Sequence, residues 1–198
     1  MPDAEANLRA AEAVAGILER HGVATVVIGG VALAAHGYVR HTEDIDLGVN
    51  AGVPALRTLA GALRDAGFVV AFREPDADDP LGGVLDITGD FGAVQVISFA
   101  GRFPGVIEDA VRATTEVIRP GSPLRLVPLP QLIALKLYAG GFKSKADIVE
   151  LLARRPATDV PALRALCKRY RLPGLEELLA EAGLDQPAPH DADGDAPR

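Results

Sequence analysis

The sequence predicts an α+β fold in which a mixed β-sheet is flanked by helices and followed by a helical C-terminal part. Three observations support this class. The buried apolar run at residues 24–28 precedes a double glycine, a short helical pattern and an acidic strand. The runs at residues 84–88 and 93–99 are joined by turn residues typical of a hairpin. Beyond about residue 128, apolar residues recur at helical spacing.

Each element of the first part is predicted from apolar spacing and from the turn residues that bound it. Gly22 and Gly29 follow runs that suit a helix and an interior strand, and Pro54 lies near the start of a later helix. We expect helices at residues 4–21, 31–36, 54–67 and 103–113, and strands at residues 24–28, 44–47, 68–72, 84–88 and 93–99. Together they form a predicted core of residues 1–119.

The second part of the chain is predicted to be mostly helical. The expected bounds are residues 115–119 and 124–127 for short β segments, 132–137 for a buried helix, Asp147 for the start of another, and 159–183 for two short helices. Residues 120–184 would close one wall of a cleft shared with the core. The acidic tail of residues 185–198 has too few apolar residues to fold and is expected to be disordered.

Composition limits the classes of protein that fit. No apolar run reaches the ~18 residues that span a bilayer, and the N-terminus lacks a basic segment followed by an apolar one, so we expect a cytoplasmic protein without membrane contact. A single cysteine, Cys167, excludes an internal disulfide. The net charge of −7 argues against a generally basic nucleic-acid binder, although the acidic tail contributes part of it.

The chemistry concentrates where the first strand meets the acidic one. Gly29 and Gly30 bring an uncrowded backbone to the start of a helix, where N–H groups without partners suit a phosphate. Asp44 and Asp46 share one face of the next strand, because side chains alternate along a strand. Two carboxylates this close repel each other and favour a cation, which is the arrangement of metal-assisted phosphoryl or nucleotidyl transfer.

At this point the sequence resembles a known superfamily. A Gly-Gly turn, a helix and then Thr42-x-Asp44-x-Asp46 are similar to the core motif of the DNA polymerase β-type nucleotidyltransferases. With Arg40 included, residues 29–47 most resemble the minimal nucleotidyltransferases of the AbiEii toxin-like group. The resemblance covers about residues 20–155.

The resemblance implies an activity, cofactors and partners. The activity is transfer of a nucleoside monophosphate from a nucleoside triphosphate to an acceptor hydroxyl, with Mg²⁺ or Mn²⁺ bound. The implied acceptor is tRNA, another RNA or a protein. The implied biological role is that of the toxin in a toxin–antitoxin system, with a cognate antitoxin protein as partner.

Members of the superfamily supply a third carboxylate from the hairpin that corresponds to residues 84–99. In this sequence the corresponding position does not hold a carboxylate. In residues 94–98 that position is assigned to Ile97. The nearest substitute is Asp86, which lies in an otherwise apolar strand, where an unpaired carboxylate would cost several kcal/mol. We therefore predict that Asp86 completes the metal ligands near the acceptor hydroxyl. The alternative is that Asp86 lies on the solvent face of an edge strand.

A second region, residues 127–152, also resembles the AbiEii-like group. Lys136, Lys143 and Asp147 match its pattern, whereas Ser144 replaces an acidic residue. The resemblance implies that Lys136 neutralises phosphate charge and that Asp147 orients a basic group or a base. The alternatives are a lysine that extends to solvent from a packed helix and a carboxylate favoured by a helix N-terminus. The predicted nucleotide-binding residues are Gly29, Gly30, Arg40, Thr42, Lys136 and Asp147, and the predicted catalytic and metal-binding residues are Asp44, Asp46 and Asp86.

Two other functions fit the same residues. A catalytically inactive binding or regulatory protein on this fold is favoured by Ile97 and Ser144. A small-molecule nucleotidyltransferase, such as one that modifies an antibiotic, would suit an acidic cleft. The basic residues near the C-terminus instead favour an RNA acceptor, although such runs are usually solvated helix faces.

Overall fold

The computed structural model describes residues 3–76 and 80–184. The predicted acidic tail of residues 185–198 lies outside the described residues. The helices are α1 (Ala4–Arg20), α2 (Gly29–Ala35), α3 (Val53–Asp65), α4 (Pro104–Ala113), α5 (Leu129–Ala139), α6 (Gly141–Arg154), α7 (Val160–Arg169) and α8 (Leu175–Glu181). The strands are β1 (Thr25–Ile28), β2 (Asp44–Val49), β3 (Val69–Arg73), β4 (Val84–Gly89) and β5 (Gly92–Ser98).

The strands form one sheet in the order β1-β2-β5-β4-β3. β2 and β5 are parallel, and the other neighbouring pairs are antiparallel. The predicted α+β class, with a mixed sheet, flanking helices and a helical C-terminal part, is confirmed.

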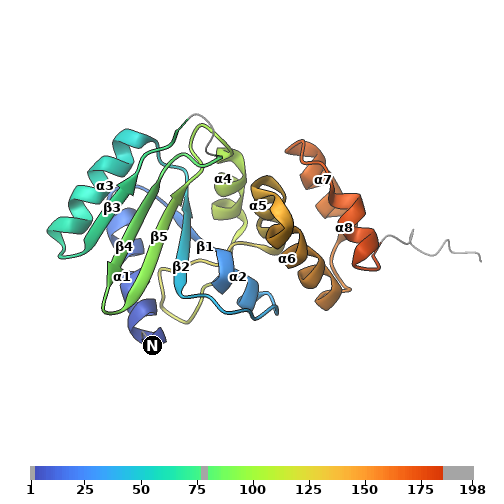
Figure 1. Ribbon diagram of the computed structural model, residues 1–198, viewed down its shortest axis with the longest axis horizontal. Helices are drawn as coiled ribbons and strands as arrows, with labels where there is room; N and C mark the ends of the chain where they lie inside the picture. Colours follow the sequence, from blue (N-terminus) through green and yellow to red (C-terminus); the bar gives the residue numbers. More distant parts are fainter. Residues whose placement is uncertain (1–2, 77–79, 185–198) are drawn as a thin grey trace, which may run out of the picture.

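One face of the sheet is covered by α1 and α3 (Figure 1). The core on this side is aliphatic and includes Leu18 of α1, Leu63 of α3, and Leu47 and Ile87 from the sheet. These side chains alternate with outward-facing ones along each strand, as expected when a single face of a strand is buried. The opposite face of β2, β5 and β4 therefore carries the polar residues.

The C-terminal helices share a second core with β1, α2 and α4 (Figure 1, right). The connection is made by backbone pairing at the outer edge of β1. The Val27 N–H donates to the Arg125 carbonyl at 2.7 Å, and the Val127 N–H donates to the Val27 carbonyl at 3.1 Å. α5 begins immediately after this pairing, which positions it beside the end of the sheet that carries Gly29.

The fold corrects one sequence-based expectation and excludes one alternative. α6 begins at Gly141 and not at Asp147. Gly140 and Gly141 have φ values of 66° and 75°, a conformation that glycine adopts easily, so the chain reverses between α5 and α6 within these residues. Asp147 thus lies inside a helix, and the helix N-terminus does not explain it. β4 is an interior strand, so Asp86 is not on an edge strand.

No helix within the described ranges combines the length and apolar character that crossing a membrane requires.

Candidate active site

The two aspartates of β2 project from the polar face of the sheet. Ile45 and Leu47, which alternate with them, are buried against the α1 side, so Asp44 and Asp46 share the opposite face. The Thr42 hydroxyl donates to Asp44 Oδ1 at 2.6 Å and fixes that carboxylate from the preceding loop.

The double glycine allows β2 and its preceding loop to approach the start of α2 closely. A Cβ atom on Gly29 would lie 1.8 Å from Asp46 Oδ2, and one on Gly30 would lie 2.6 Å from the Thr42 Cβ atom. Gly29 also has a φ of 65°, which L side chains rarely adopt. Gly29 is therefore required by both backbone conformation and space, and it forms a cradle against the Asp46 carboxylate.

Asp46 has a pKa well above its ordinary value. Burial, followed by the nearby charge of Asp44, raises the pKa of Asp46 to about 6. The charges of Lys136, Arg40 and Lys143 oppose this shift without cancelling it. Two adjacent oxygen-donor groups with uncompensated negative charge fit a hard divalent cation such as Mg²⁺ or Mn²⁺.

The helical wall opposite the aspartates has its own charged cluster. Lys136 of α5 donates to Asp147 Oδ2 of α6 at 2.6 Å; the Asp147 side chain is buried and that of Lys136 is half-buried. Arg40 Nε lies 3.3 Å from Asp147 Oδ1, which is ion-pair distance, but without hydrogen-bond geometry. Burial lowers the pKa of the Lys136 ammonium, and the contact with Asp147 opposes this effect. The structure thus brings Arg40, Lys136 and Asp147 together.

A cleft of about 280 Å³ lies between the two walls. Gly29, Asp46 and Ile97 line it from the sheet side, and Lys136 and Ser144 line it from the helices. Most of the remaining lining is apolar, contributed by Leu81, Phe99, Leu132, Leu135 and Tyr138 among others. A concave apolar surface with a few convergent charged groups is typical of a small-molecule site.

A second hollow of about 440 Å³ lies between α1, α2 and the loop that precedes β2. Asp44, Thr42 and Glu43 line it together with Asn7 and apolar residues of α1 and α2. The Asn7 amide donates to the Glu43 carbonyl at 3.3 Å, and its buried Oδ1 has no hydrogen-bond partner among the described residues. Asp44 and Asp46 therefore border two different hollows.

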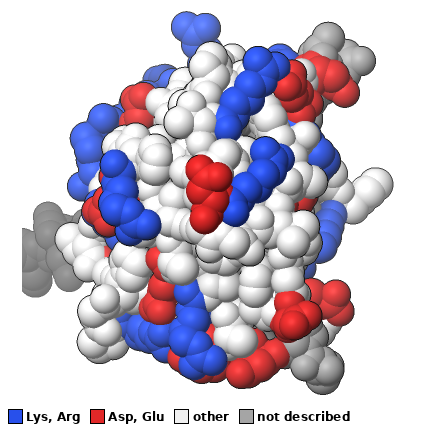
Figure 2. All heavy atoms as spheres, turned by 90° about the vertical axis from the view of Figure 1, so that its left-hand side faces the viewer, with Lys and Arg blue, Asp and Glu red and all other residues white. Residues whose placement is uncertain are grey.

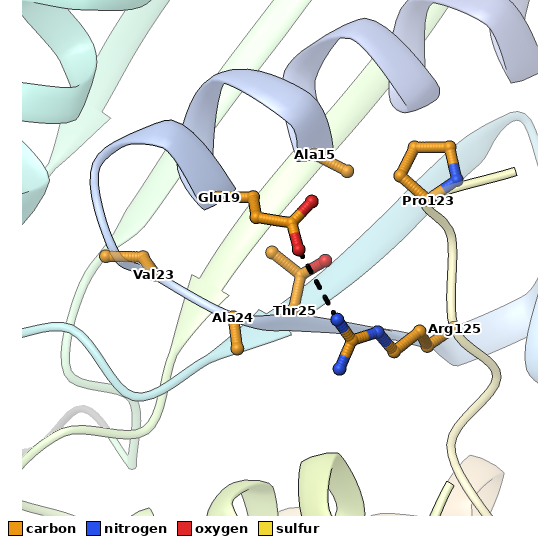
Figure 3. A pocket seen from close by; sticks show the side chains of 7 residues that line it. All are labelled: Ala15, Glu19, Val23, Ala24, Thr25, Pro123 and Arg125. Carbon is orange, nitrogen blue, oxygen red and sulfur yellow. Dashed lines mark hydrogen bonds and ion pairs between the residues drawn. The ribbon is translucent and has the colours of Figure 1, made fainter. Parts of the chain in front are cut away.

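A third hollow, shown in Figure 3, is much smaller than the other two. It lies between the end of α1 and residues 123–125, where Arg125 pairs with Glu19 at 3.4 Å. Its volume of about 10 Å³ is too small for a substrate. We therefore regard this ion pair as part of the support of β1 and α1.

Asp86 lies on the same polar face, but not next to Asp46. In the sheet register Asp46 pairs with Gln95, and Gln95 pairs with Asp86. The residue beside Asp46 is thus Gln95, whereas Ile97 pairs with Gly48. Within residues 3–76 and 80–184, no group of three or more His, Cys, Asp or Glu side chains could hold a metal ion.

Asp86 is held by two side chains that the sequence analysis missed. Arg73 of β3 donates to both carboxylate oxygens, at 2.6 Å and 3.0 Å, and Gln95 Nε2 donates to Oδ1 at 2.7 Å. Counting back along both strands from the hairpin turn could have paired Gln95 with Asp86, because a hairpin fixes its own register. The contact with Arg73 depends on the β3–β4 pairing across a longer loop.

The basic residues near the C-terminus are largely engaged within the molecule. Arg164 pairs with Glu176 at 2.7 Å, Arg169 pairs with Asp109, and Arg155 donates to the His36 carbonyl at 2.9 Å. At the α3 and β3 end of the molecule, positive and negative side chains are interspersed (Figure 2). These arrangements are typical of solvated helix faces and give little support to an extended phosphate-binding surface.

Comparisons with known proteins give structural similarity alone. No family model matches the chain, and no curated protein matches its sequence. A solution structure of the antibiotic-resistance factor ANT(2'')-Ia is 18% identical, with 92% of this chain and 91% of that chain covered and a TM-score of 0.47. A crystal structure of ANT(2'')-Ia with adenylyl-2''-tobramycin is 16% identical, with 89% and 94% covered and a TM-score of 0.44. The structure of JHP933 from Helicobacter pylori is 16% identical, with 93% and 82% covered and a TM-score of 0.48. At this level of similarity, the function must be argued from the geometry of the site.

Proposed function

We propose that the protein transfers a nucleoside monophosphate from a nucleoside triphosphate to an acceptor hydroxyl. The observation that supports this most is the half-buried Asp46, whose pKa is raised by burial and by Asp44 and whose carboxylate rests in the cradle of Gly29. A pair of anions without a compensating cation, facing a cleft that also contains Lys136, fits a metal–triphosphate complex.

Asp44 and Asp46 would hold the metal. When bound, Mg²⁺ or Mn²⁺ would stabilise the charge that develops on the transferred phosphoryl group and on the leaving pyrophosphate. Thr42 keeps the Asp44 carboxylate in place through its hydrogen bond.

The triphosphate would lie between the start of α2 and the helical wall. The backbone N–H groups of Gly29 and Gly30 would donate to phosphate oxygens, because N–H groups in the first turn of a helix have no partner within the helix. Lys136, Arg40 and Lys143 supply the positive field that acts on Asp46. Asp147 holds Lys136 at the cleft, so its proposed part is to orient that ammonium. The part predicted for Asp86, as a third ligand near the acceptor, remains a prediction.

For the acceptor, the resemblance of the motifs favours tRNA, another RNA or a protein, and with it a toxin role and an antitoxin partner. A second candidate, a small-molecule acceptor, is favoured by the hollow beside Asp44. Its lining is mostly apolar, it includes Glu43 and Asp44, and no described residue that lines it is Lys or Arg. Such a surface suits a neutral or cationic compound better than a phosphate backbone.

The test is label transfer from each α-labelled nucleoside triphosphate, with Mg²⁺, to total RNA, cellular protein and a small-molecule extract. The variant Asp44→Ala/Asp46→Ala is compared with Asp90→Ala, which removes an exposed carboxylate from the hairpin turn. Label that requires Asp44 and Asp46 but not Asp90 would establish the activity, and its destination would identify the acceptor class. If no pool takes label from any triphosphate, the proposal fails, and a non-catalytic binding protein on this fold is left.

A further inference from the structure

Three polar side chains form a row across the open face of the sheet. Asp46 on β2, Gln95 on β5 and Asp86 on β4 are consecutive partners in the register. Partners on neighbouring strands project to the same face, and neighbouring strands are about 4.8 Å apart. Gln95 therefore lies next to Asp46, whereas Asp86 is displaced by about 10 Å in the plane of the sheet.

The hydrogen bond between Gln95 and Asp86 determines which atom of the Gln95 amide, Nε2 or Oε1, can still bind another group. A carboxylate only accepts hydrogen bonds, so the 2.7 Å contact with Asp86 Oδ1 assigns the donor Nε2 to that side. Among the hydrogen bonds of the described residues, none donates to Gln95 Oε1. This oxygen is thus an available acceptor on the strand adjacent to Asp46.

Asp86 is in a different electrostatic state from the aspartates of β2. Its two oxygens accept from Arg73 in bidentate geometry, and one also accepts from Gln95. The guanidinium compensates its charge, and both oxygens are already engaged. To coordinate a metal near Asp46, Asp86 would have to leave these partners and extend past Gln95.

We infer that Gln95, through Oε1, is the third protein oxygen of the metal site and that Asp86 is a positioning residue that acts through Gln95. This inference rests on the proposed function, because it assumes a cation held by Asp44 and Asp46. Amide oxygens are suitable ligands for hard divalent cations. The site would then hold two carboxylates and one neutral oxygen, one negative charge fewer than a site with three carboxylates.

The experiment measures Mn²⁺ binding to the full chain from the electron paramagnetic resonance signal of free Mn²⁺. Gln95→Met, which keeps the length of the side chain but removes the amide, is expected to weaken binding about tenfold. Asp86→Asn retains an oxygen that accepts from Gln95 and is expected to bind within about twofold of wild type. Asp86→Leu removes that acceptor and should weaken binding by up to about tenfold. Asp86→Leu should have no further effect in the Gln95→Met background.

Two results would overturn the inference. If Asp86→Asn loses as much Mn²⁺ affinity as Asp46→Asn, Asp86 is itself a ligand. If Gln95→Met binds Mn²⁺ like wild type, Gln95 is not a ligand. Failure of the proposed metal site has a different signature, because Asp44→Asn and Asp46→Asn would then also bind like wild type. Thermal unfolding followed by circular dichroism checks that each variant is folded.

Discussion

The two walls of the cleft differ in how their buried charges are compensated. On the helical wall, Asp147 accepts from Lys136 and lies beside Arg40, so that its carboxylate is compensated within the protein. On the sheet wall, Asp46 is half-buried next to Asp44, and the neighbouring cations do not prevent its pKa from rising to about 6. The helical wall thus compensates its carboxylate within the protein, whereas the sheet wall keeps two adjacent carboxylates without an ion-pair partner among the described residues.

The largest expected effect comes from removing the carboxylates of the sheet wall. Asp44→Ala/Asp46→Ala should lower nucleotidyl transfer by at least about 10³-fold, because both groups that would hold the metal are lost. The fold should persist, because neither Asp44 nor Asp46 forms an ion pair with a Lys or Arg of the described residues. Initial rates of label transfer, with Asp90→Ala as the control, check this prediction. A variant that unfolds would show that the aspartates support the fold.

Substitutions in the helical wall should instead lower the stability of the fold. Lys136→Met leaves Asp147 buried without its hydrogen-bond donor and should lower the free energy of unfolding by about 3 kcal/mol. Chemical denaturation measures this change. Lys145→Met, an exposed lysine of α6, is the control and should change stability by less than about 0.5 kcal/mol. Lys136→Met/Asp147→Asn should recover part of the loss, since no buried carboxylate is then left without its hydrogen-bond donor, although Arg40 loses its ion-pair partner.

The two walls also predict a specific pH dependence in metal-free protein. The folded pKa of Asp46, about 6, lies above its ordinary value of 3.8, so the folded state binds the proton more tightly than the unfolded state. The resulting destabilisation is fully present above pH 6 and disappears as the pH falls through 6 towards 4. Asp46→Asn should therefore raise the free energy of unfolding by roughly 2–3 kcal/mol at pH 8 and by little at pH 4.

Denaturation with chelator present at several pH values measures this difference. An equal gain from Asp46→Asn at pH 4 and pH 8 would contradict it. Added Mn²⁺ should stabilise wild type and leave Asp46→Asn nearly unchanged, because only the former retains both carboxylates.

The smallest expected effect comes from replacing Gly29 by alanine. Comparison with Gly37 distinguishes the cost of the backbone conformation from the cost of the close approach to Asp46. Gly29 and Gly37 both have positive φ, but a Cβ atom on Gly37 would meet nothing within 4 Å. Each alanine variant should lose about 1 kcal/mol of stability through backbone strain. Gly29→Ala should in addition displace the Asp46 carboxylate and weaken Mn²⁺ binding, and equal Mn²⁺ affinity in the two variants would contradict this.

The local part of the site could be predicted from the sequence, whereas its contacts between distant residues could not. The alternation that places Asp44 and Asp46 on one face, and the glycines before α2, depend on neighbours in the chain. The Arg40–Asp147 and Arg73–Asp86 contacts depend on how separate elements dock. The position of Gln95 beside Asp46 depends on the register of β2 with β5, which no turn connects directly.

The start of α6 shows another limit. Gly140 and Gly141 indicate a break in the helical pattern, but glycines alone do not say how soon the next helix begins. The structure shows that the helix resumes at Gly141, which moves Asp147 from a helix end to a buried position facing Lys136. The burial of the Asp147 carboxylate is therefore explained by its hydrogen bond with Lys136 and not by its position along the sequence.

The pairing of residues 125–127 with β1 has a consequence for synthesis of the chain on the ribosome. Until these residues emerge, the outer edge of β1 is an unpaired row of N–H and C=O groups flanked by the apolar side chains of Val26, Val27 and Ile28. Such an edge is prone to pair with other strands. A nascent or truncated chain that stops at residue 119 would expose this edge, so we expect a fragment of residues 1–119 to aggregate and one that extends past residue 127 to aggregate less.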